Sequence, residues 1–391
     1  MIFAGYTSPV ATMYNLDSYS FPAHYERSRM WANMGPGTAV TRRTLLSPDY
    51  MTVNINNYGY VLPYAVSFDL NTADSWDTIV GTNYTVAANR AGKNFYVYAC
   101  QPISGCVPVI LISAATTFPS GYTATNSRKI AQFHCECANV GTIAGHALTG
   151  YLAGDILPRS IQDLKHRPKV GFIGGVVWGG PTDFDSLNYA PIWKAIYMAS
   201  GTGVNVASVF GAAASTTRDW NSFVSDFGLI GCRMMKDAEF QVLCTGIEEE
   251  VNIAGSANPT TTGGHVSTTG RRMISNIGSE DDAGVWWQWL DEQSYQFAGA
   301  ANHTHQVIVS GDPQTVTTGN PSGDVAPTWG WYNLPGAAGS LYKQGTYGDI
   351  KLLAGGAWNH AADAGSRARS ASNSRWSASS ALGGRFSASP Q

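Results

Sequence analysis

Cysteines and a histidine are the residues of this chain best suited to hold a metal. Cys100 and Cys106 form a C-x5-C pair, and His134, Cys135 and Cys137 follow within H-C-E-C. Thiolate and imidazole groups are ligands of zinc, but structural zinc sites usually bring two cysteines together in a C-x2-C knuckle. The alternation of a β-strand instead places Cys135 and Cys137 on one face, where buried thiols act as small apolar side chains. The pattern therefore favours buried, unligated cysteines.

Other candidate ligand clusters are also better explained without a metal. His303 and His305 form an H-x-H pair in a segment rich in Gly, Thr and Pro (298–327), which predicts a surface loop or a small hairpin. The acidic runs 248–250 and 280–282 could offer oxygens to calcium, but neither has the spacing of an EF-hand. We interpret them as a solvated helix end and a loop.

Motifs of catalysis are missing from the sequence. There is no G-x-S-x-G nucleophile elbow and no phosphate-binding G-x4-G-K-[ST] loop. The glycine-rich run VGFIGGVVWGG (170–180) also lacks the G-x-G-x-x-G spacing, and its small and apolar residues predict a tightly packed strand. The sequence thus indicates neither a catalytic residue nor a cofactor.

Composition limits the kind of fold that can position any site. Of the 391 residues, 13% are charged and 12% are aromatic, and 43 are glycines. Because domains usually hold about 100–200 residues, we expect two. The low share of charge predicts a fold stabilised by aromatic and apolar burial. A net charge of -3 gives no general attraction to nucleic acid or anionic membranes, and the sequence shows neither a signal peptide nor a transmembrane run.

The first part of the chain has the pattern of antiparallel β-structure. Short runs of Val, Ile, Tyr, Phe and Thr, such as NFYVYAC and KIAQFHCEC, recur between Met51 and about Val140 and are separated by Asn, Gly and Pro. This spacing predicts an all-β domain, a sandwich or a barrel. We place its end at residue 157, before the polar connector RSIQDLKHRPK (159–169).

The second part, residues 158–391, combines helical patterns with many short segments. The apolar residues of DWNSFVSDFG repeat at i, i+3, i+4 and i+7, which predicts an amphipathic helix closed by Gly228. DAEFQVLCTGI repeats this spacing, with Asp237 as the expected N-cap. Helices followed by short Gly- and Trp-rich segments predict an α+β domain, so we expect the whole chain to be α+β.

The last segment, residues 355–386, has the composition of a solvated tail. It is dominated by Ala, Ser, Asn and Arg. Its arginines are too sparse for an arginine-serine repeat, and we interpret them as pins that tie loops to carboxylates or carbonyls. Large apolar residues also interrupt the segment and predict that it is folded: Trp358, Trp376, Leu382 and Phe386.

The motifs of the second part together resemble a known fold family. Five of them occur in the order of the C-type-lectin-type fold that formylglycine-generating enzymes share: CRMMKDAEFQ (232–241), GVWWQWLDE (284–292), GGAW (355–358), GSRAR (365–369) and GGRF (383–386). The resemblance covers about 165–391 and is greater to the variable proteins of diversity-generating retroelements, a group that includes phage tropism determinants. The enzymes rely on cysteines in the segment matching 358–375, and this chain has none after Cys244. The resemblance therefore implies a binding protein.

The resemblance also implies that residues 355–386 form a variable segment, whose codons are rewritten at adenines. Such a segment must accept many side chains while its backbone stays fixed. Its mostly small residues predict a shallow site with Asn359, His360, Asp363 and Asn373 as specific contacts. The implied ligand-binding positions are Asn359, His360, Ala361, Ala362, Asp363, Ala368, Ser370, Ala371, Ser372, Asn373, Ser374, Ser377 and Ala378. The implied scaffold positions are Gly355, Gly356, Trp358, Arg367, Arg369, Trp376, Gly383, Gly384, Arg385 and Phe386.

The leading hypothesis is a receptor-binding protein of a phage tail. A β domain (1–157) would dock on the virion or oligomerise, and a lectin-type domain (158–391) would present the variable segment to a host receptor, protein or glycan. By resemblance we expect a homotrimer that gains strength through avidity and contacts other tail proteins. We expect no nucleic-acid partner, no membrane insertion, no cofactor and no metal. Two alternatives stay open: a structural virion protein without variable binding, and a metalloenzyme of the formylglycine-generating type with a histidine-rich metal site.

Overall fold

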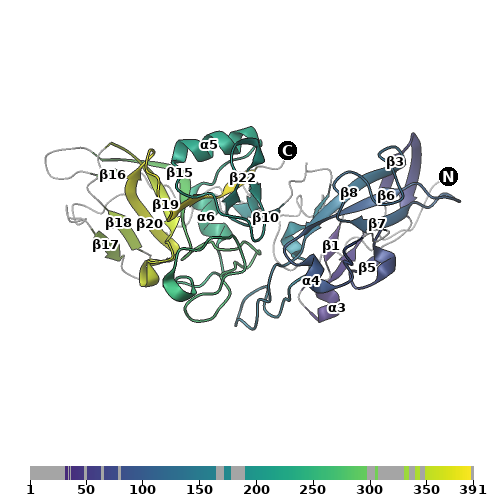
Figure 1. Cartoon of the computed structure of the whole chain (residues 1–391), viewed down its shortest axis with the longest axis horizontal. Helices are drawn as coiled ribbons and strands as arrows, with labels where there is room; N and C mark the ends of the chain where they lie inside the picture. Colours follow the sequence, from purple (N-terminus) through teal and green to yellow (C-terminus); the bar gives the residue numbers. More distant parts are fainter. Residues whose placement is uncertain are drawn as a thin grey trace, which may run out of the picture. The chain divides into compact units, whose positions relative to one another are not determined.

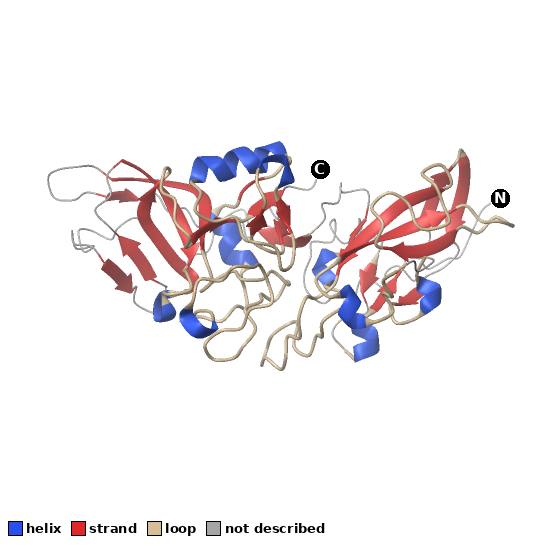
Figure 2. Cartoon of the chain, in the orientation of Figure 1, coloured by secondary structure: helices blue, strands red, loops and turns tan. Residues whose placement is uncertain are grey.

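The protein is built mostly of β-strands with few helices (Figure 2). Its contacts divide the chain into two compact units. The first comprises Met1–Asn139 and Gly150–Val170 with Gln391, and the second comprises Val140–Thr149 and Gly171–Pro390. The computed structural model describes residues 31–33, 35, 37–47, 51–62, 66–77, 81–163, 171–177, 190–296, 304–306, 330–333, 340–343 and 348–388. Within these residues no helix has the length and apolarity that a bilayer span requires.

The first unit contains the strands predicted between residues 51 and 140. Its four-stranded sheet has the order β7-β6-β8-β9, in which NFYVYAC forms β6 and KIAQFH lies in β8 (Figure 1). A hairpin of β3 and β4 and a sheet of order β1-β2-β5 lie in the same unit. The bounds are β1 Ala32–Asn33, α3 Ala39–Arg42, β2 Thr44–Leu46, β3 Met51–Ile55, β4 Tyr58–Leu62, β5 Ser67–Asp69, α4 Ala87–Arg90, β6 Asn94–Cys100, β7 Val109–Ser113, β8 Ser127–His134 and β9 Gln162–Asp163.

Strand β6 explains why this unit folds as it does. Its side chains alternate between two apolar clusters, because successive residues of a strand point to opposite faces. Phe95, Val97 and Ala99 lie in the main core of the unit. Tyr96 and Tyr98 belong to a second, smaller cluster on the other face. The sheet is therefore covered on both faces, as its nearly continuous apolar sequence requires.

The second unit is organised around a large mixed sheet. Its path is β16-β15-β19-β20-β18-β17, with β21 parallel to β15, and a smaller sheet has the order β10-β11-β22-β14. The run VGFIGGVVWGG contributes β10, and residues 178–180 of it lie outside the described part. The bounds are β10 Phe172–Val177, β11 Ala190–Ala195, β12 Ala199–Ser200, β13 Ala207–Ser208, β14 Arg233–Met234, β15 Trp287–Gln296, β16 Thr304–Gln306, β17 Gly330–Asn333, β18 Ser340–Lys343, β19 Gly348–Gly355, β20 Gly365–Ser374, β21 Leu382–Gly384 and β22 Phe386–Ala388.

Helix α5 (Trp220–Leu229) has the predicted amphipathic stripe. Phe223 and Phe227 are fully buried, and the Asp219 carboxylate accepts a hydrogen bond from the Ser222 N–H at 2.8 Å, which caps the helix start. The helix runs one residue beyond Gly228, the predicted closing position. Gly228 was expected to stop it, but the last turn closes with the Ile230 N–H donating to the Gly228 carbonyl.

Helix α6 (Asp237–Leu243) shows that the predicted N-cap was wrong. Asp237 is the first residue of the helix, and its carboxylate binds a buried arginine instead of capping. The residue before the helix, Lys236, donates its N–H to the Glu239 carboxylate at 2.9 Å, as in half of a capping box. The cap is therefore supplied from the third helical position.

The acidic run 280–282 is a loop as expected, but it is not solvated. Glu280, Asp281 and Asp282 are each at most 1% exposed, because each carboxylate has a cationic partner in the second unit. Arg272 binds Glu280 at 2.6 Å, and Lys194 binds Asp282 at 2.7 Å. The excursion 298–327 lies outside the described residues except for β16.

Removing the cap of α5 tests the fold in this region. Asp219→Ala should lower the free energy of unfolding by about 1 kcal/mol, since it leaves a helical N–H without its acceptor. Asp219→Asn keeps an acceptor and should lose much less. The urea midpoints of the purified proteins measure both, and equal losses for the two variants would contradict the capping role.

Candidate functional site

The variable segment (355–386) is a folded part of the second unit. It leaves the large sheet at the end of β19, forms a loop with a short 3-10 helix (Ala361–Asp363), and returns as β20 (Figure 1). A second loop, residues 375–381, leads to β21 and β22. We call residues 357–364 the first loop and residues 375–381 the second loop. Strand pairing on both sides of each loop fixes where the loops begin and end.

Glycines are required where the segment enters the first loop. Gly355 and Gly356 have φ values of 95° and 83°, in the left-handed region. A Cβ on Gly355 would lie 2.5 Å from the Asp282 carbonyl oxygen, and one on Gly356 would lie 2.7 Å from the Ala364 Cα. Both backbone conformation and space therefore exclude other residues here.

Arg385 holds the end of the variable segment to distant parts of the unit. Its side chain is fully buried and donates to the carbonyl oxygens of Ala195 at 2.9 Å and Ile196 at 2.6 Å. It also donates to the Gln288 Oε1 at 3.0 Å and lies 3.4 Å from the Asp282 carboxylate. Arg385 lies between β21 and β22 in the sequence. Its planar guanidinium thus joins β11, β15 and the acidic loop to these two strands.

Arg369 performs the same role inside β20. Its Nε lies 2.5 Å from the Asp237 carboxylate, with both side chains at most 1% exposed. The remaining donors reach the Gln241 Oε1 at 3.1 Å and the carbonyl oxygen of Ser366 at 2.8 Å. The guanidinium also lies over the Phe240 ring, 5.1 Å from its centre. Helix α6 is therefore attached to β20 through a side chain that points away from solvent.

Glu292 is a titratable neighbour of this ion pair. Burial raises the pKa of its carboxyl to about 7. A hydrogen bond from the Asp237 N–H lowers it, and the negative charges of Asp237 and Asp291 raise it further. The carboxyl therefore changes charge near neutral pH beside the helix that supports β20.

The predicted ligand-binding positions differ in exposure. Those of the two loops reach solvent, whereas those in the middle of β20 do not. Asn359, Ala361, Ala362 and Ala378 are exposed, and His360, Asp363, Asn373, Ser374 and Ser377 are half-buried. Ala368, Ser370, Ala371 and Ser372 are buried, at 3%, 2%, 0% and 7% exposure.

Burial corrects the prediction for the middle of β20. Ala371 belongs to an apolar cluster together with residues of α6 and β19, and Ala368 lies in the main core of the unit. Since these side chains fill the interior, they cannot touch a ligand. The residues of this segment are all small, but for two different reasons. Those in the loops are exposed, and those in the strand are tightly packed.

Trp287 brings the two loops together. Its ring contacts the ring of His360 in the first loop, with centres 5.3 Å apart. Its backbone N–H donates to the Ala381 carbonyl in the second loop at 2.9 Å. Trp358, which is half-buried, donates its backbone N–H to the Val285 carbonyl. One buried tryptophan therefore contacts both loops.

His360 is less available to a ligand than the sequence indicated. Its Nδ1 accepts a hydrogen bond from the Ala357 N–H at 3.1 Å, and burial lowers the pKa of the imidazole. The ring is therefore neutral at physiological pH and fixes the first loop. Asn359, which precedes it, is exposed and remains a contact that the geometry allows.

Trp376 is the residue that sequence reasoning placed wrongly. It was expected to anchor the core, but its side chain is 70% exposed in the second loop. Its neighbour Arg375 packs over the Trp220 ring at 5.6 Å instead. One signal was available: residues 372–380 contain no other large apolar side chain, so nothing nearby in sequence would share a core with Trp376.

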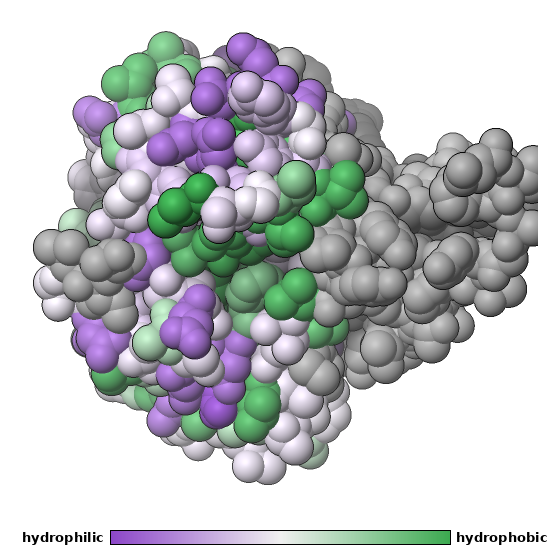
Figure 3. All heavy atoms as spheres, turned by 90° about the vertical axis from the view of Figure 1, so that its right-hand side faces the viewer, coloured by the Kyte–Doolittle hydropathy of each residue, from purple (hydrophilic) through white to green (hydrophobic). Residues whose placement is uncertain are grey.

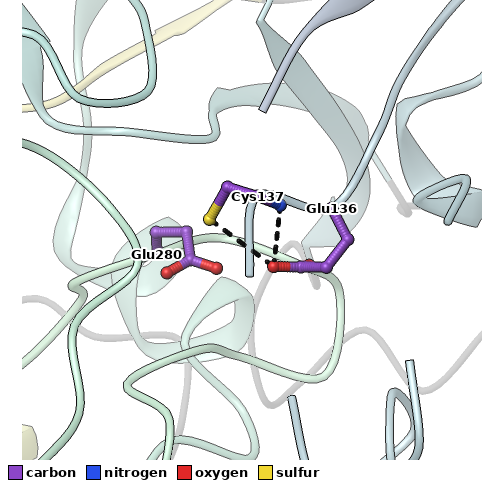
Figure 4. Close-up of side chains that lie close together, drawn as sticks. All are labelled: Glu136, Cys137 and Glu280. Atoms are coloured by element: carbon purple, nitrogen blue, oxygen red, sulfur yellow. Dashed lines mark hydrogen bonds between the residues drawn. The ribbon is translucent and has the colours of Figure 1, made fainter. Parts of the chain in front are cut away.

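The Cys135 and Cys137 side chains of the first unit are buried parts of its structure. Cys135 is buried, and burial raises the pKa of its thiol. The Glu136 carboxylate accepts hydrogen bonds from the Cys137 N–H at 3.0 Å and from its thiol at 3.5 Å (Figure 4). His134 shares a hydrogen bond of 2.9 Å with Asn94. Protonated thiols and a bonded imidazole are the states of structural side chains.

Histidines of the second unit are likewise engaged where they are described. His265 lies 2.9 Å from the Asp281 carboxylate, and His360 lies against Trp287. His166 and His303, and the side chain of His305, lie outside the described part of the chain.

Comparison with known proteins identifies relatives along most of the chain. Residues 52–163 match the family described as the Mtd second domain. The tail fiber receptor-binding protein of Bordetella phage BPP-1 is 26% identical over 305 residues, which are 73% of this chain and 68% of that protein. Solved structures of the U1 and M1 variants of Major Tropism Determinant each have a TM-score of 0.58 at 18% identity. They cover 93% and 91% of this chain and 83% of each of those chains.

These likenesses define the class of the protein: it has the fold of the phage tropism determinants. The chain is similar over most of its length to the Bordetella phage tail fiber receptor-binding protein, and its residues 52–163 match the Mtd second-domain family. The predicted resemblance to the phage tropism determinants is thereby confirmed.

Large side chains should distinguish the exposed positions from the buried ones. Ala371→Tyr overfills the core and should lower the free energy of unfolding by about 1–3 kcal/mol or more. Ala378→Tyr projects into solvent and should change it by no more than about 0.5 kcal/mol. Denaturant titration of the two purified variants measures the difference. Equal tolerance at both positions would show that Ala371 is free to vary.

Titration of Glu292 should make stability depend on pH. Because its folded pKa lies above its ordinary value of 4.5, the neutral form stabilises the fold below about pH 4.5, and this contribution is lost as the pH rises through about 7. Glu292→Gln should therefore melt at a higher temperature than wild type at pH 8 and at a similar one at pH 4. Glu250→Gln, at an exposed position, serves as the control. Parallel melting curves for wild type and Glu292→Gln from pH 4 to 8 would contradict the shift.

Proposed function

We propose that this chain is the receptor-binding, tropism-determining protein of a phage tail. The observation that carries the proposal is the separation of frame and surface in the variable segment. Buried glycines and arginines fix the backbone, while small side chains of both loops, namely Ala, Asn and Ser, face solvent. A surface built in this way accepts new side chains without loss of the fold, which is what diversified binding requires. Its homologue is named a tail fiber receptor-binding protein.

We further propose the division of labour predicted from the sequence. Residues 158–391 are a C-type-lectin-like domain that presents the loops to a host receptor, protein or glycan. Residues 1–157 are a β-rich domain for docking on the virion or for oligomerisation, and the assembly is a homotrimer. The first unit exposes apolar side chains that a partner surface could cover, among them Ile103, Val107 and Val109. Figure 3 shows apolar side chains gathered between polar ones on one face.

An enzymatic role receives no comparable support. The homologues carry names of receptor-binding and tropism-determining proteins. The buried carboxylates of residues 280–282 are paired with Arg272, Lys194 and His265, which leaves these groups occupied with stabilising the fold.

An exchange of the surface tests the proposed function. Residues 359–363 and 373–378 are replaced by those of a sister variant, while the buried positions 368–372 are retained. Host range should change, and adsorption to the original strain should fall by at least about tenfold, which corresponds to 1.4 kcal/mol of binding free energy. Phage plating and adsorption-rate measurements record both effects. The control exchanges only the buried residues Ala368, Ser370, Ala371 and Ser372 for similarly small residues and keeps Arg369. Unchanged adsorption after the surface exchange would refute the proposal.

A further inference from the structure

Trp376 is an exposed aromatic side chain on a rigid turn. Its exposure of 70% is the largest among the exposed aromatic residues of the described part. The backbone around it is fixed from both sides. Three backbone hydrogen bonds do this. The Trp220 backbone N–H donates to the Arg375 carbonyl at 3.1 Å, and the Ser377 N–H donates to the Ser374 carbonyl at 2.9 Å. The Thr217 N–H donates to the Ser379 carbonyl at 2.9 Å. The indole is therefore presented in a defined place, although it contributes little to the core.

An exposed tryptophan on a fixed backbone has the properties of a binding anchor. Tryptophan buries about 150–250 Å² when covered and has only two side-chain torsions to restrict, so it contributes much contact for little loss of entropy. Such residues are the ones most enriched among those that dominate binding energy. Folding leaves this surface uncovered, so its burial is available to a ligand.

The groups around Trp376 indicate the chemistry of that ligand. Residues 373–380, NSRWSASS, supply an amide and several hydroxyls, and no Asp or Glu occurs after Asp363. The one cation of this stretch, Arg375, is stacked on Trp220. What remains is an aromatic plane flanked in sequence by neutral groups that both donate and accept hydrogen bonds. The hydroxyls of Ser374 and Ser377 bond each other at 3.3 Å, whereas Ser379 and Ser380 are exposed. A sugar ring matches this arrangement, since its C–H face packs on the negative face of the indole and its hydroxyls reach serine and asparagine.

We infer that Trp376 anchors a saccharide of the host surface by stacking against a sugar ring, an inference that rests on the proposed receptor-binding function. A protein receptor fits these observations less well. A protein footprint takes about 800 Å² of each partner and several large anchors. In the variable segment, all of which is described, Trp376 is the exposed large apolar side chain, and its neighbours are small.

The test uses phage particles that carry the chain with Trp376→Ala, Trp376→Phe or Val204→Ala, the last at a residue of the same unit that is 69% exposed and lies outside the variable segment. Adsorption to the strain on which the phage plates is measured. Trp376→Ala should lower the adsorption rate at least about tenfold, Trp376→Phe should retain most of it, and Val204→Ala should leave it unchanged. Melting temperatures of the purified variants, expected to match wild type, show that the fold is retained.

A second arm identifies the class of ligand. Host cells are treated with periodate, which cleaves the vicinal diols of sugars, or with proteinase K. Periodate should abolish adsorption, and proteinase K should not. Wild-type adsorption by Trp376→Ala would overturn the anchor role, and loss of adsorption after proteinase K alone would establish a protein receptor instead. If exchange of residues 359–363 and 373–378 leaves host range unchanged, the proposed function fails, independently of these results.

Discussion

The structure depends on fixing the backbone of residues 355–386 without help from the exposed side chains of its two loops. Arg385 meets this constraint most directly. Its buried guanidinium binds the carbonyl oxygens of Ala195 and Ile196, the amide of Gln288 and the carboxylate of Asp282. Each partner is far from residue 385 in sequence. The strands β21 and β22 are therefore held by groups that lie outside the predicted variable positions. The loops can change while this attachment stays the same.

The same constraint explains the buried acidic loop at residues 280–282. Buried carboxylates are costly unless they are paired and hydrogen-bonded. Here Lys194, Arg272 and Arg385 provide the opposite charges, and the carbonyl oxygens of the loop accept from Gln288 and Arg385. Gly355 packs directly on the Asp282 carbonyl, with no space for a Cβ. The loop is thus a polar support under the point where the variable segment begins.

The frame leaves a surface of unusual composition. Around Trp287, the first and second loops expose mostly alanine, serine and asparagine, with the indole of Trp376 as the large exception. Small side chains contribute little binding energy individually, so affinity must come from few anchors or from several copies of the site acting together. A single aromatic residue at a variable surface therefore carries more weight here than it would in a larger interface.

Local sequence determined the elements of this protein, because periodicity and turn residues act within a few positions. The alternation in NFYVYAC specified β6, and the helical spacing of Trp220, Phe223 and Phe227 specified α5. The motifs from GGAW to GGRF carried the resemblance to the phage tropism determinants. Tertiary structure alone decided which of the small residues reach solvent. Ala371 and Ala378 are identical in sequence terms, yet one fills the core beside α6 and the other faces solvent. It also decided that Asp237 pairs with Arg369, that residues 280–282 are buried, and that Trp376 is exposed. These outcomes depend on partners outside the local sequence, 132 residues away for Asp237 and Arg369 and 88 for Lys194 and Asp282.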